Sequence, residues 1–292
     1  MNLTFFSLIN EERADRNIIG AMEYRHDGGS FIGSLLHDFE LLILVICKDL
    51  DQDIVTIEHC MSGDMHYQLL YIDSNAIQRW VMAGDNREIV QCFIHGKIIW
   101  DVDGELASLH ANITEFGESM REQRKFKEFT KFLQMCLEAK RYVQEKDLMD
   151  AYYSVIQALK HYARIELIDQ GILPESSVWE QVRSLNSVVY KLFDELTDNK
   201  ETLEQRIELV LIASEFTVVS KMVDCCSPLL RILGSRKVTW SIQELIRLPE
   251  LSHVKEELPM VLRKLVYRSI VKESATGPRG GYGDGSEIRY WV

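Results

Sequence analysis

The sequence has no long hydrophobic run and no leader-like beginning, and both absences limit where the protein works. Its longest uninterrupted apolar run, Leu41 to Cys47, is far shorter than the roughly 20 residues that a membrane-spanning helix needs. Acidic residues appear early, at Glu11, Glu12 and Asp15, where a signal peptide would carry basic and then apolar residues. We therefore expect a cytoplasmic protein with no membrane partner.

The sequence also lacks closely spaced cysteine pairs and an excess of positive charge. None of its 6 cysteines lies in a C-x-x-C spacing, so they predict reduced thiols and no zinc site. With 33 basic and 45 acidic residues, the formal net charge is −12. That charge argues against non-specific binding to nucleic acid through a broad basic surface. Nucleic acid is accordingly not an expected partner.

The hydrophobic periodicity changes along the chain and predicts two domains, for which 292 residues give enough length. In the first part, a helix is predicted over residues 2–21. Short apolar or alternating segments there predict strands. These are the run Leu41–Cys47 and the segments Ile54–His59, His66–Ile72 and Lys97–Trp100. The first domain is therefore predicted to cover residues 1–115.

From Leu106 onward the period is helical, and a bundle is predicted over residues 116–273. Its most apolar helix, Leu203 to Cys226, is predicted to lie at the centre of the bundle. Another helix is predicted from Ser176 to Leu196. The glycine-rich end, residues 274–292, has too few core-forming residues for a helix and predicts a flexible tail.

A turn followed by a buried strand carries the strongest functional signal. Asp38 and Glu40 precede the apolar run, and because strand side chains alternate, they project to the same side. Two neighbouring carboxylates repel each other unless they share a proton or bind a cation. Mg²⁺ prefers such oxygen ligands and often recruits substrate phosphates. Just upstream, Gly33 and Ser34 can bring N–H groups and a hydroxyl close to a phosphate.

At these residues the sequence resembles the nucleotidyltransferase superfamily, whose members carry a Gly-Ser pair and then Asp-x-Asp or Asp-x-Glu opening a hydrophobic strand. More narrowly, it is similar to bacterial nucleotidyltransferase-like proteins of the kanamycin-nucleotidyltransferase type, which have a helical C-terminal substrate-binding domain. The resemblance implies an α+β fold: a small mixed-sheet domain followed by an all-α bundle. It also implies that Gly33 and Ser34 hold nucleotide phosphates and that Asp38 and Glu40 bind Mg²⁺ and serve catalysis.

The sequence departs from the family pattern in two places. The Gly-Ser pair lies closer to the acids than in most members. Members also carry a third acid on a later strand. Here the polar residues on one face of that strand are Asp64, His66 and Gln68; Asp64 lies too early, at the start of the strand, and His66 and Gln68 are not carboxylates. Without that acid, transfer chemistry lacks its usual base and one metal ligand. Asp101 is a weaker candidate, and a turn closing a strand is the plainer interpretation of it.

Three functions remain open on this reasoning. The first is Mg²⁺-dependent transfer of a nucleoside monophosphate from an NTP to an acceptor hydroxyl. The second is a nucleotide-binding or regulatory protein of the same fold with a decayed catalytic set. The third is a helical interaction protein, in which case Asp38 and Glu40 mark only an exposed strand start and Gly33-Ser34 an ordinary turn. The acceptor and the oligomeric state are not specified, and a homodimer is one alternative.

Overall fold

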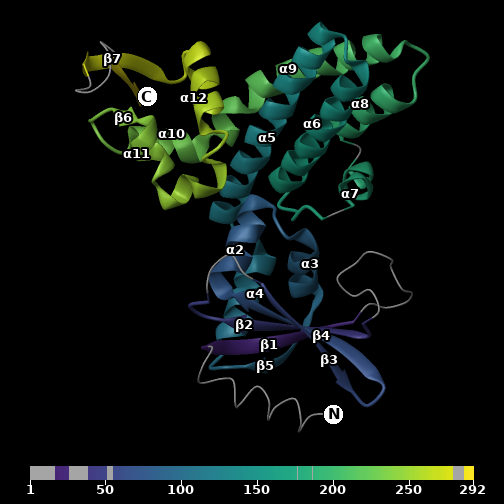
Figure 1. The fold of residues 1–292 in the computed structure, drawn as a ribbon. Coiled ribbons are helices and arrows are strands. Elements are labelled where there is room, and N and C mark those ends of the chain that lie inside the picture. The colour runs from purple at the N-terminus through teal and green to yellow at the C-terminus, as the bar shows by residue number, and fades with distance from the viewer. Residues whose placement is uncertain (1–16, 26–38, 51–54, 176, 186, 279–285) are drawn as a thin grey trace. The chain divides into compact units, whose positions relative to one another are not determined.

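The computed structural model describes residues 17–25, 39–50, 55–175, 177–185, 187–278 and 286–292 of the chain (Figure 1). The chain divides into two compact units, Met1–Gly117 and Glu118–Val292. The division lies two residues beyond the predicted end of the first domain. No helix within the described residues is long and apolar enough to cross a membrane.

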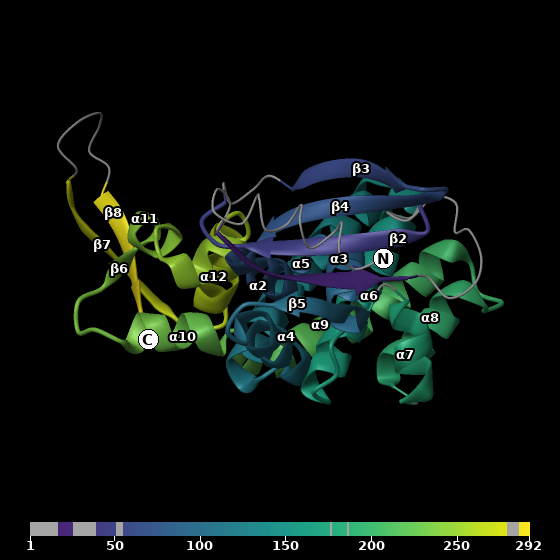
Figure 2. The same ribbon diagram turned by 90° about the horizontal axis from the view of Figure 1, so that it is seen from below.

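The first unit contains a five-stranded mixed sheet in the order β3-β4-β2-β1-β5, which Figure 2 shows from below, with the strands side by side. Its central strand β2 runs parallel to β4 and antiparallel to β1. The strands are β1 (Ile18–Tyr24), β2 (Leu41–Cys47), β3 (Thr56–Ser62), β4 (Met65–Asp73) and β5 (Lys97–Asp101). Every residue of β2 is buried, which confirms the predicted interior strand.

The predicted N-terminal helix is wrong in its described part, because Ile18–Tyr24 forms β1. This segment pairs with β2 on one side and β5 on the other. Its two leading isoleucines are β-branched and suit a strand better than a helix. Gly20 allows the covering helix to approach closely, because a Cβ there would lie 2.7 Å from Leu106 Cδ2. The remaining residues of that prediction, 2–16, lie outside the described part.

Three helices lie on the same side of this sheet (Figure 1): α2 (Ser74–Ala83), α3 (Arg87–His95) and α4 (Glu105–Glu115). Asp73 begins α2 as expected, because its Oδ1 accepts hydrogen bonds from the N–H groups of Asn75 and Ala76 at 2.9 and 3.1 Å. The other face of the sheet is also apolar and buried, around Ile43, Val45 and Tyr71. The pairing of β2 with β4, which runs from Leu41 opposite Tyr67 to Cys47 opposite Asp73, sets the position of Glu40 just before the strand.

The second unit is largely helical, as predicted, and its core is formed where α5 and α6 pack along each other with α9. The predicted helix from Ser176 to Leu196 is two helices, because Ser187 starts a new one by accepting the N–H of Val189 at 3.2 Å. The helices are α5 (Glu118–Glu145), α6 (Leu148–Asp169), α7 (Val178–Ser184), α8 (Val188–Thr197), α9 (Leu203–Cys225), α10 (Ser227–Gly234), α11 (Ile242–Ile246), the 3₁₀ turn η1 (Pro249–Val254) and α12 (Leu258–Tyr267).

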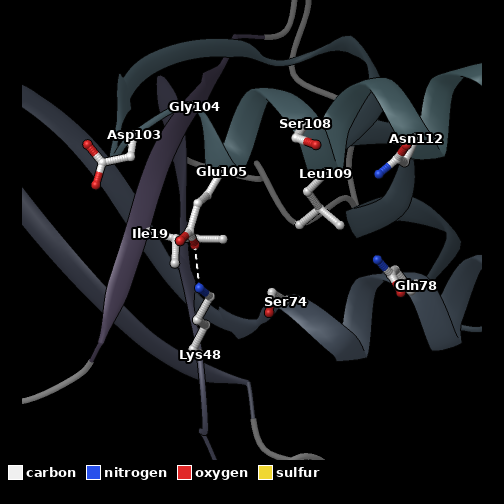
Figure 3. Close-up of a pocket in the computed structure, with 10 residues that line it drawn as sticks. All are labelled: Ile19, Lys48, Ser74, Gln78, Asp103, Gly104, Glu105, Ser108, Leu109 and Asn112. Carbon is white, nitrogen blue, oxygen red and sulfur yellow. Dashed lines mark ion pairs between the residues drawn. The ribbon is translucent and has the colours of Figure 1, made fainter.

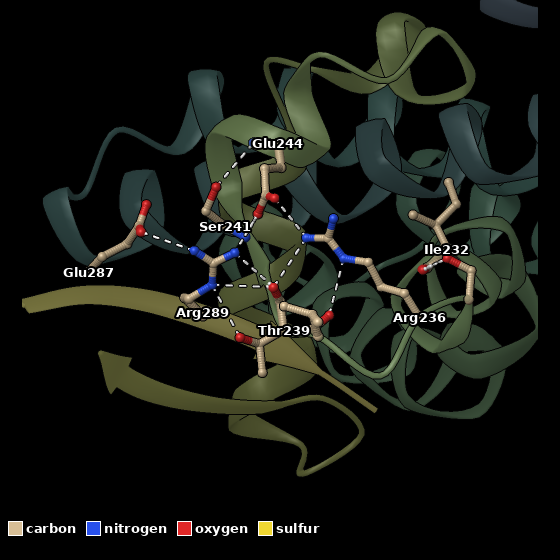
Figure 4. A network of polar contacts seen from close by, with 9 residues as sticks. Ile232, Arg236, Thr239, Ser241, Glu244, Glu287 and Arg289 are labelled. Atoms are coloured by element: carbon tan, nitrogen blue, oxygen red, sulfur yellow. Dashed lines mark hydrogen bonds and ion pairs between the residues drawn. The ribbon is translucent and has the colours of Figure 1, made fainter. Parts of the chain in front are cut away.

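The predicted flexible tail is wrong for its described residues. Here β7 (Lys272–Pro278) and β8 (Ser286–Trp291) pair with each other and with the short β6 (Trp240–Ser241). Tyr290 is buried in the helical core, and Arg289 donates to the carbonyl of Thr239 at 2.9 Å and pairs with Glu244 at 2.7 Å (Figure 4). The composition argument failed because β-forming residues follow the glycine-rich stretch and pair with partners far away in the sequence.

Candidate functional site

Of the predicted site, the structure describes Glu40 and the candidates on later strands. Gly33, Ser34 and Asp38 lie outside the described residues. Their predicted roles, and the pairing of Asp38 with Glu40, therefore stay predictions. The described residues nevertheless fix the end of the sheet at which such a site would lie.

Glu40 lies at the entrance of β2, beside the start of β4. Its backbone N–H donates to the carbonyl of His66 at 3.0 Å, and the parallel pairing begins with the next residue, Leu41, opposite Tyr67. Glu40 and His66 are therefore level with each other on neighbouring strands, and both are exposed. No described residue forms a hydrogen bond or ion pair with the Glu40 carboxylate.

Gln68 lies one step further into the sheet on the same face as His66. Its side chain is only 5% exposed, and its Oε1 has no hydrogen-bond partner. Burying an amide oxygen without a partner costs about 1–3 kcal/mol. The strand pairing sets Gln68 level with Leu42 of β2 and His59 of β3. The amide oxygen without a partner therefore belongs to a residue that is level with Leu42, the second residue of β2.

Among the described residues, His59 also lies at this end of the sheet, and the sequence did not predict it there. It is paired with Gln68 in register, and its ring lies 4.6 Å from the ring of Phe39, the residue before Glu40. The signal was present in the sequence. The hairpin turns at Gly63 and Asp64, and residues equally distant from a tight turn face each other across an antiparallel pair.

The donors described at this end fit Mg²⁺ only in part. Within the described residues, no group of three or more His, Cys, Asp or Glu side chains could hold a metal ion. Glu40 supplies one carboxylate, and Gln68 supplies one amide oxygen, whereas His59 and His66 offer imidazole nitrogens. Mg²⁺ prefers oxygen ligands, so the site suits this ion only if the Asp38 carboxylate joins Glu40.

Asp101 belongs to the opposite end of the sheet and does not fill the place of a third acid. It pairs with Gly20, which is itself level with Ile46, near the end of β2. That position is six residues from Glu40, or about 20 Å along a strand. Both Asp101 oxygens are engaged at the start of α4, accepting from the N–H of Leu106 at 2.9 Å and of Ala107 at 3.1 Å. Asp101 is a helix-capping residue.

A shallow pocket of about 400 Å³ opens at this opposite end (Figure 3). Lys48 crosses it to pair with Glu105 at 2.5 Å. The starts of α2 and α4 both border the pocket, but Asp73 and Asp101 already accept their free N–H groups. Two carboxylates in these positions leave little positive potential for a phosphate. The pocket therefore does not have the character of a phosphate site.

A second polar cluster is buried in the helical unit and consists of Arg124, Glu128, His161 and Arg164. Glu128 accepts from Arg124 at 2.6 Å and from His161 at 2.5 Å, and its Oε2 lies 3.5 Å from Arg164. Burial alone would raise the pKa of Glu128. Arg124, the His161 hydrogen bond and Arg164 together hold this pKa far below its usual range. The carboxylate is thus permanently charged and fully engaged, and it joins α5 to α6.

Comparisons with known proteins agree with this division of the chain. A family model described as nucleotidyltransferase-like matches residues 2–121, and one described as a YgxA-like substrate binding domain matches residues 122–221. The uncharacterized protein YgxA of Bacillus subtilis strain 168 is 32% identical over 238 residues, covering 82% of this chain and 80% of that protein. A crystal structure of a nucleotidyltransferase-like protein from Exiguobacterium sibiricum 255-15 has a TM-score of 0.86 and 26% identity, covering 98% of this chain and 97% of that chain.

Proposed function

We propose that this chain, which belongs to the nucleotidyltransferase-like family and carries a YgxA-like substrate-binding domain, transfers a nucleoside monophosphate from an NTP to an acceptor hydroxyl in the presence of Mg²⁺. One observation carries the proposal. The carboxylate of Glu40 is exposed, without a described partner, at the entrance of a fully buried strand. The family resemblance assigns the metal-binding acids to that position.

The proposed roles follow from the positions of the residues. Glu40, together with Asp38, would hold Mg²⁺, and Gly33 and Ser34 would bind the terminal phosphates. The bound ion supplies polarisation of the α-phosphate and offsets charge on the leaving pyrophosphate. Glu40 is held in place by its own backbone, because its N–H is fixed on the carbonyl of His66. The helical unit, which matches a substrate-binding domain, would supply the acceptor site.

A second function, nucleotide binding without transfer, is favoured by Gln68. On the face of β4 beside β2, the described polar side chains are His66 and Gln68, and neither is a carboxylate. A neutral amide cannot accept a proton from an attacking hydroxyl or balance the charge of a second metal ion. If no third acid joins the site, the protein would keep the nucleotide and its metal but lose the transfer step.

Calorimetry on the full chain tests nucleotide binding, which both functions share. ATP with Mg²⁺ should bind to the wild type, and Glu40→Gln and Asp38→Asn should each weaken binding by about tenfold or more, because each removes a charged metal ligand. Glu115→Gln, an exposed acid on α4 of the same unit, is the matched control and should bind as the wild type does. An absence of nucleotide binding at millimolar ATP would contradict both functions.

Pyrophosphate release separates the two functions. Each of the four common NTPs is incubated with the protein, Mg²⁺ and a small-molecule extract as the source of acceptors. Release that is lost in Glu40→Gln supports transfer. Nucleotide binding without pyrophosphate release supports the second function. Gln68→Glu then tests whether the missing third acid is the cause, because a carboxylate on β4 should raise any residual release of pyrophosphate.

A further inference from the structure

A narrow cavity in the helical unit is lined by more positive than negative side chains. It is formed by residues of α5, α9 and the end of α12. Its charged lining residues are Lys140, Glu215, Lys264 and Arg268. Three cations and one carboxylate give the cavity a formal charge of +2, although the whole chain carries −12. We call Lys140, Lys264 and Arg268 the basic triad.

One member of the basic triad is paired with an acid, and the other two are not. Lys140 forms an ion pair with Glu215, the carboxylate that lines the same cavity. Within the described part of the chain, neither Lys264 nor Arg268 forms an ion pair or a side-chain hydrogen bond. Both lie beside the ring of Tyr267, at 5.8 and 5.7 Å from its centre. An aromatic ring attracts a cation only weakly at a distance of about 6 Å.

The end of α12 does not require the charges of Lys264 and Arg268. Basic side chains often lie in the last turn of a helix because its final carbonyls lack partners. Here the backbone supplies those partners. The carbonyl of Lys264 accepts the N–H of Arg268 at 3.1 Å. The carbonyl of Val266 accepts the N–H of Ser269 at 2.9 Å. Capping of the helix therefore does not explain the two cations.

The members of the basic triad lie close enough to affect one another. Partial burial, followed by the charges of Arg268 and Lys140, lowers the pKa of Lys264 from its ordinary value. Glu215 opposes this shift only in part. The hydrogen bond from Lys140, together with the nearby cations, in turn lowers the pKa of Glu215. Because like charges repel, an anion placed among the three cations would stabilise them.

We propose that the basic triad binds a phosphate group, either as inorganic phosphate or on a small phosphate ester. A phosphate dianion matches the formal charge of +2 in the cavity. The guanidinium of Arg268 can donate two parallel hydrogen bonds to phosphate oxygens, and Lys264 supplies a point charge beside it. The cavity has a volume of about 10 Å³, which is room for about one water-sized atom. One phosphate oxygen therefore enters the cavity, and the rest of the ligand lies at its mouth beside the exposed Arg268.

Protection of Lys264 from acetylation tests this site on the full chain. An N-hydroxysuccinimide ester of acetic acid modifies neutral lysine amines, and mass spectrometry gives the acetylated fraction of Lys264 at each concentration of inorganic phosphate. Ionic strength is held constant with NaCl. Half protection is expected at about 1–10 mM phosphate, whereas the exposed Lys237 of the same unit should not be protected. Neither ATP nor Mg²⁺ is present, so the result is independent of the nucleotide site at Glu40.

Two substitutions should change phosphate binding in opposite directions. Arg268→Gln should raise the half-protecting concentration by about fivefold or more, because it removes a charged hydrogen-bond donor. Glu215→Gln should lower it by about twofold or more, because it removes the carboxylate that opposes the anion. Arg247→Gln, at another exposed arginine of the helical unit, is the matched control and should protect as the wild type does. Circular dichroism verifies that all three variants are folded.

Glycerol 3-phosphate, titrated in the same way, distinguishes the two sources of the phosphate group. Protection at a lower concentration than with inorganic phosphate identifies a phosphate ester as the ligand, and the reverse order identifies the free ion. Three results would overturn the site: no protection of Lys264 by either compound at about 50 mM, equal protection of Lys237, or unchanged protection in Arg268→Gln.

Discussion

The carboxylates of Glu40 and Glu128 occupy opposite environments in the two units. Glu40 is exposed at the entrance of the central strand of a sheet and has no described partner, whereas Glu128 is buried and contacts two arginines and a histidine. A carboxylate that is fully paired in the interior stabilises a particular packing of helices but cannot accept a ligand. An exposed carboxylate without a described partner contributes little to stability. The comparison therefore assigns a structural role to Glu128, whereas Glu40 is the acid that the proposed function uses as a metal ligand.

The largest expected difference lies in the stability of two matched variants. Glu128→Gln removes the charge that compensates Arg124 and Arg164 in the interior, so we expect the free energy of unfolding to fall by about 3–5 kcal/mol. Glu40→Gln should change it by less than about 0.5 kcal/mol. Urea unfolding followed by circular dichroism measures both. If both substitutions lowered the free energy of unfolding by the same amount, the proposed difference between the two environments would be contradicted.

As the pH falls, the helical unit should unfold before the unit that contains the five-stranded sheet, because of His253 on η1. Burial, together with the nearby Lys127, lowers the pKa of His253 to about 4, from an ordinary value near 6.5. The native state therefore binds this proton more weakly than the unfolded state does. Stability is fully present above pH 6.5 and is lost as the pH falls toward 4, by roughly 2–3 kcal/mol.

The substitution His253→Phe should flatten this pH dependence while keeping the edge-on ring contact with Phe126. Urea unfolding of both proteins at several values between pH 7 and pH 4.5 gives the measurement. His110→Phe, in the N-terminal unit, is the matched control and should retain the dependence. An unchanged slope in His253→Phe would show that another group of the helical unit binds the proton.

The smallest expected effect on stability concerns Gln68, where a single substitution compares a structural role with a role in ligand binding. Gln68→Leu removes an amide whose oxygen has no partner, so stability should be unchanged or rise by up to about 1 kcal/mol. The same variant should weaken the binding of Mg²⁺ and ATP if the amide oxygen serves the nucleotide site. Calorimetry and urea unfolding of this single variant measure the two effects. A clear loss of stability with unchanged binding would assign Gln68 to structure alone.

Local patterns in the sequence predicted much of the first unit. The apolar run that became β2 and the Asp73 start of α2 depend on neighbouring residues, and both are confirmed. The family resemblance, the α+β fold class and the largely helical second part are confirmed by the family models and the Exiguobacterium structure. These features needed no knowledge of distant contacts.

The failures share a physical cause, which is pairing between residues far apart in the sequence. β1 was predicted as a helix because its strand partners, β2 and β5, are not visible in its own periodicity. The strand β8 was missed because Tyr290 and Arg289 are held by Trp240 and Thr239. The burial of Arg164 on α6 likewise depends on Glu128, which lies on α5. The polar pattern on one helix does not reveal a charge on its neighbour.

The most direct test of the account is to locate a bound nucleotide on the chain. We would irradiate the full chain with 8-azido-ATP and Mg²⁺, with unlabelled ATP as the competitor, and identify the modified peptides by mass spectrometry. The account predicts competed labelling within residues 33–40 or on β3 and β4 near His59 and His66. Competed labelling confined to the Asp103–Asn112 wall of the pocket at the opposite end of the sheet would contradict it.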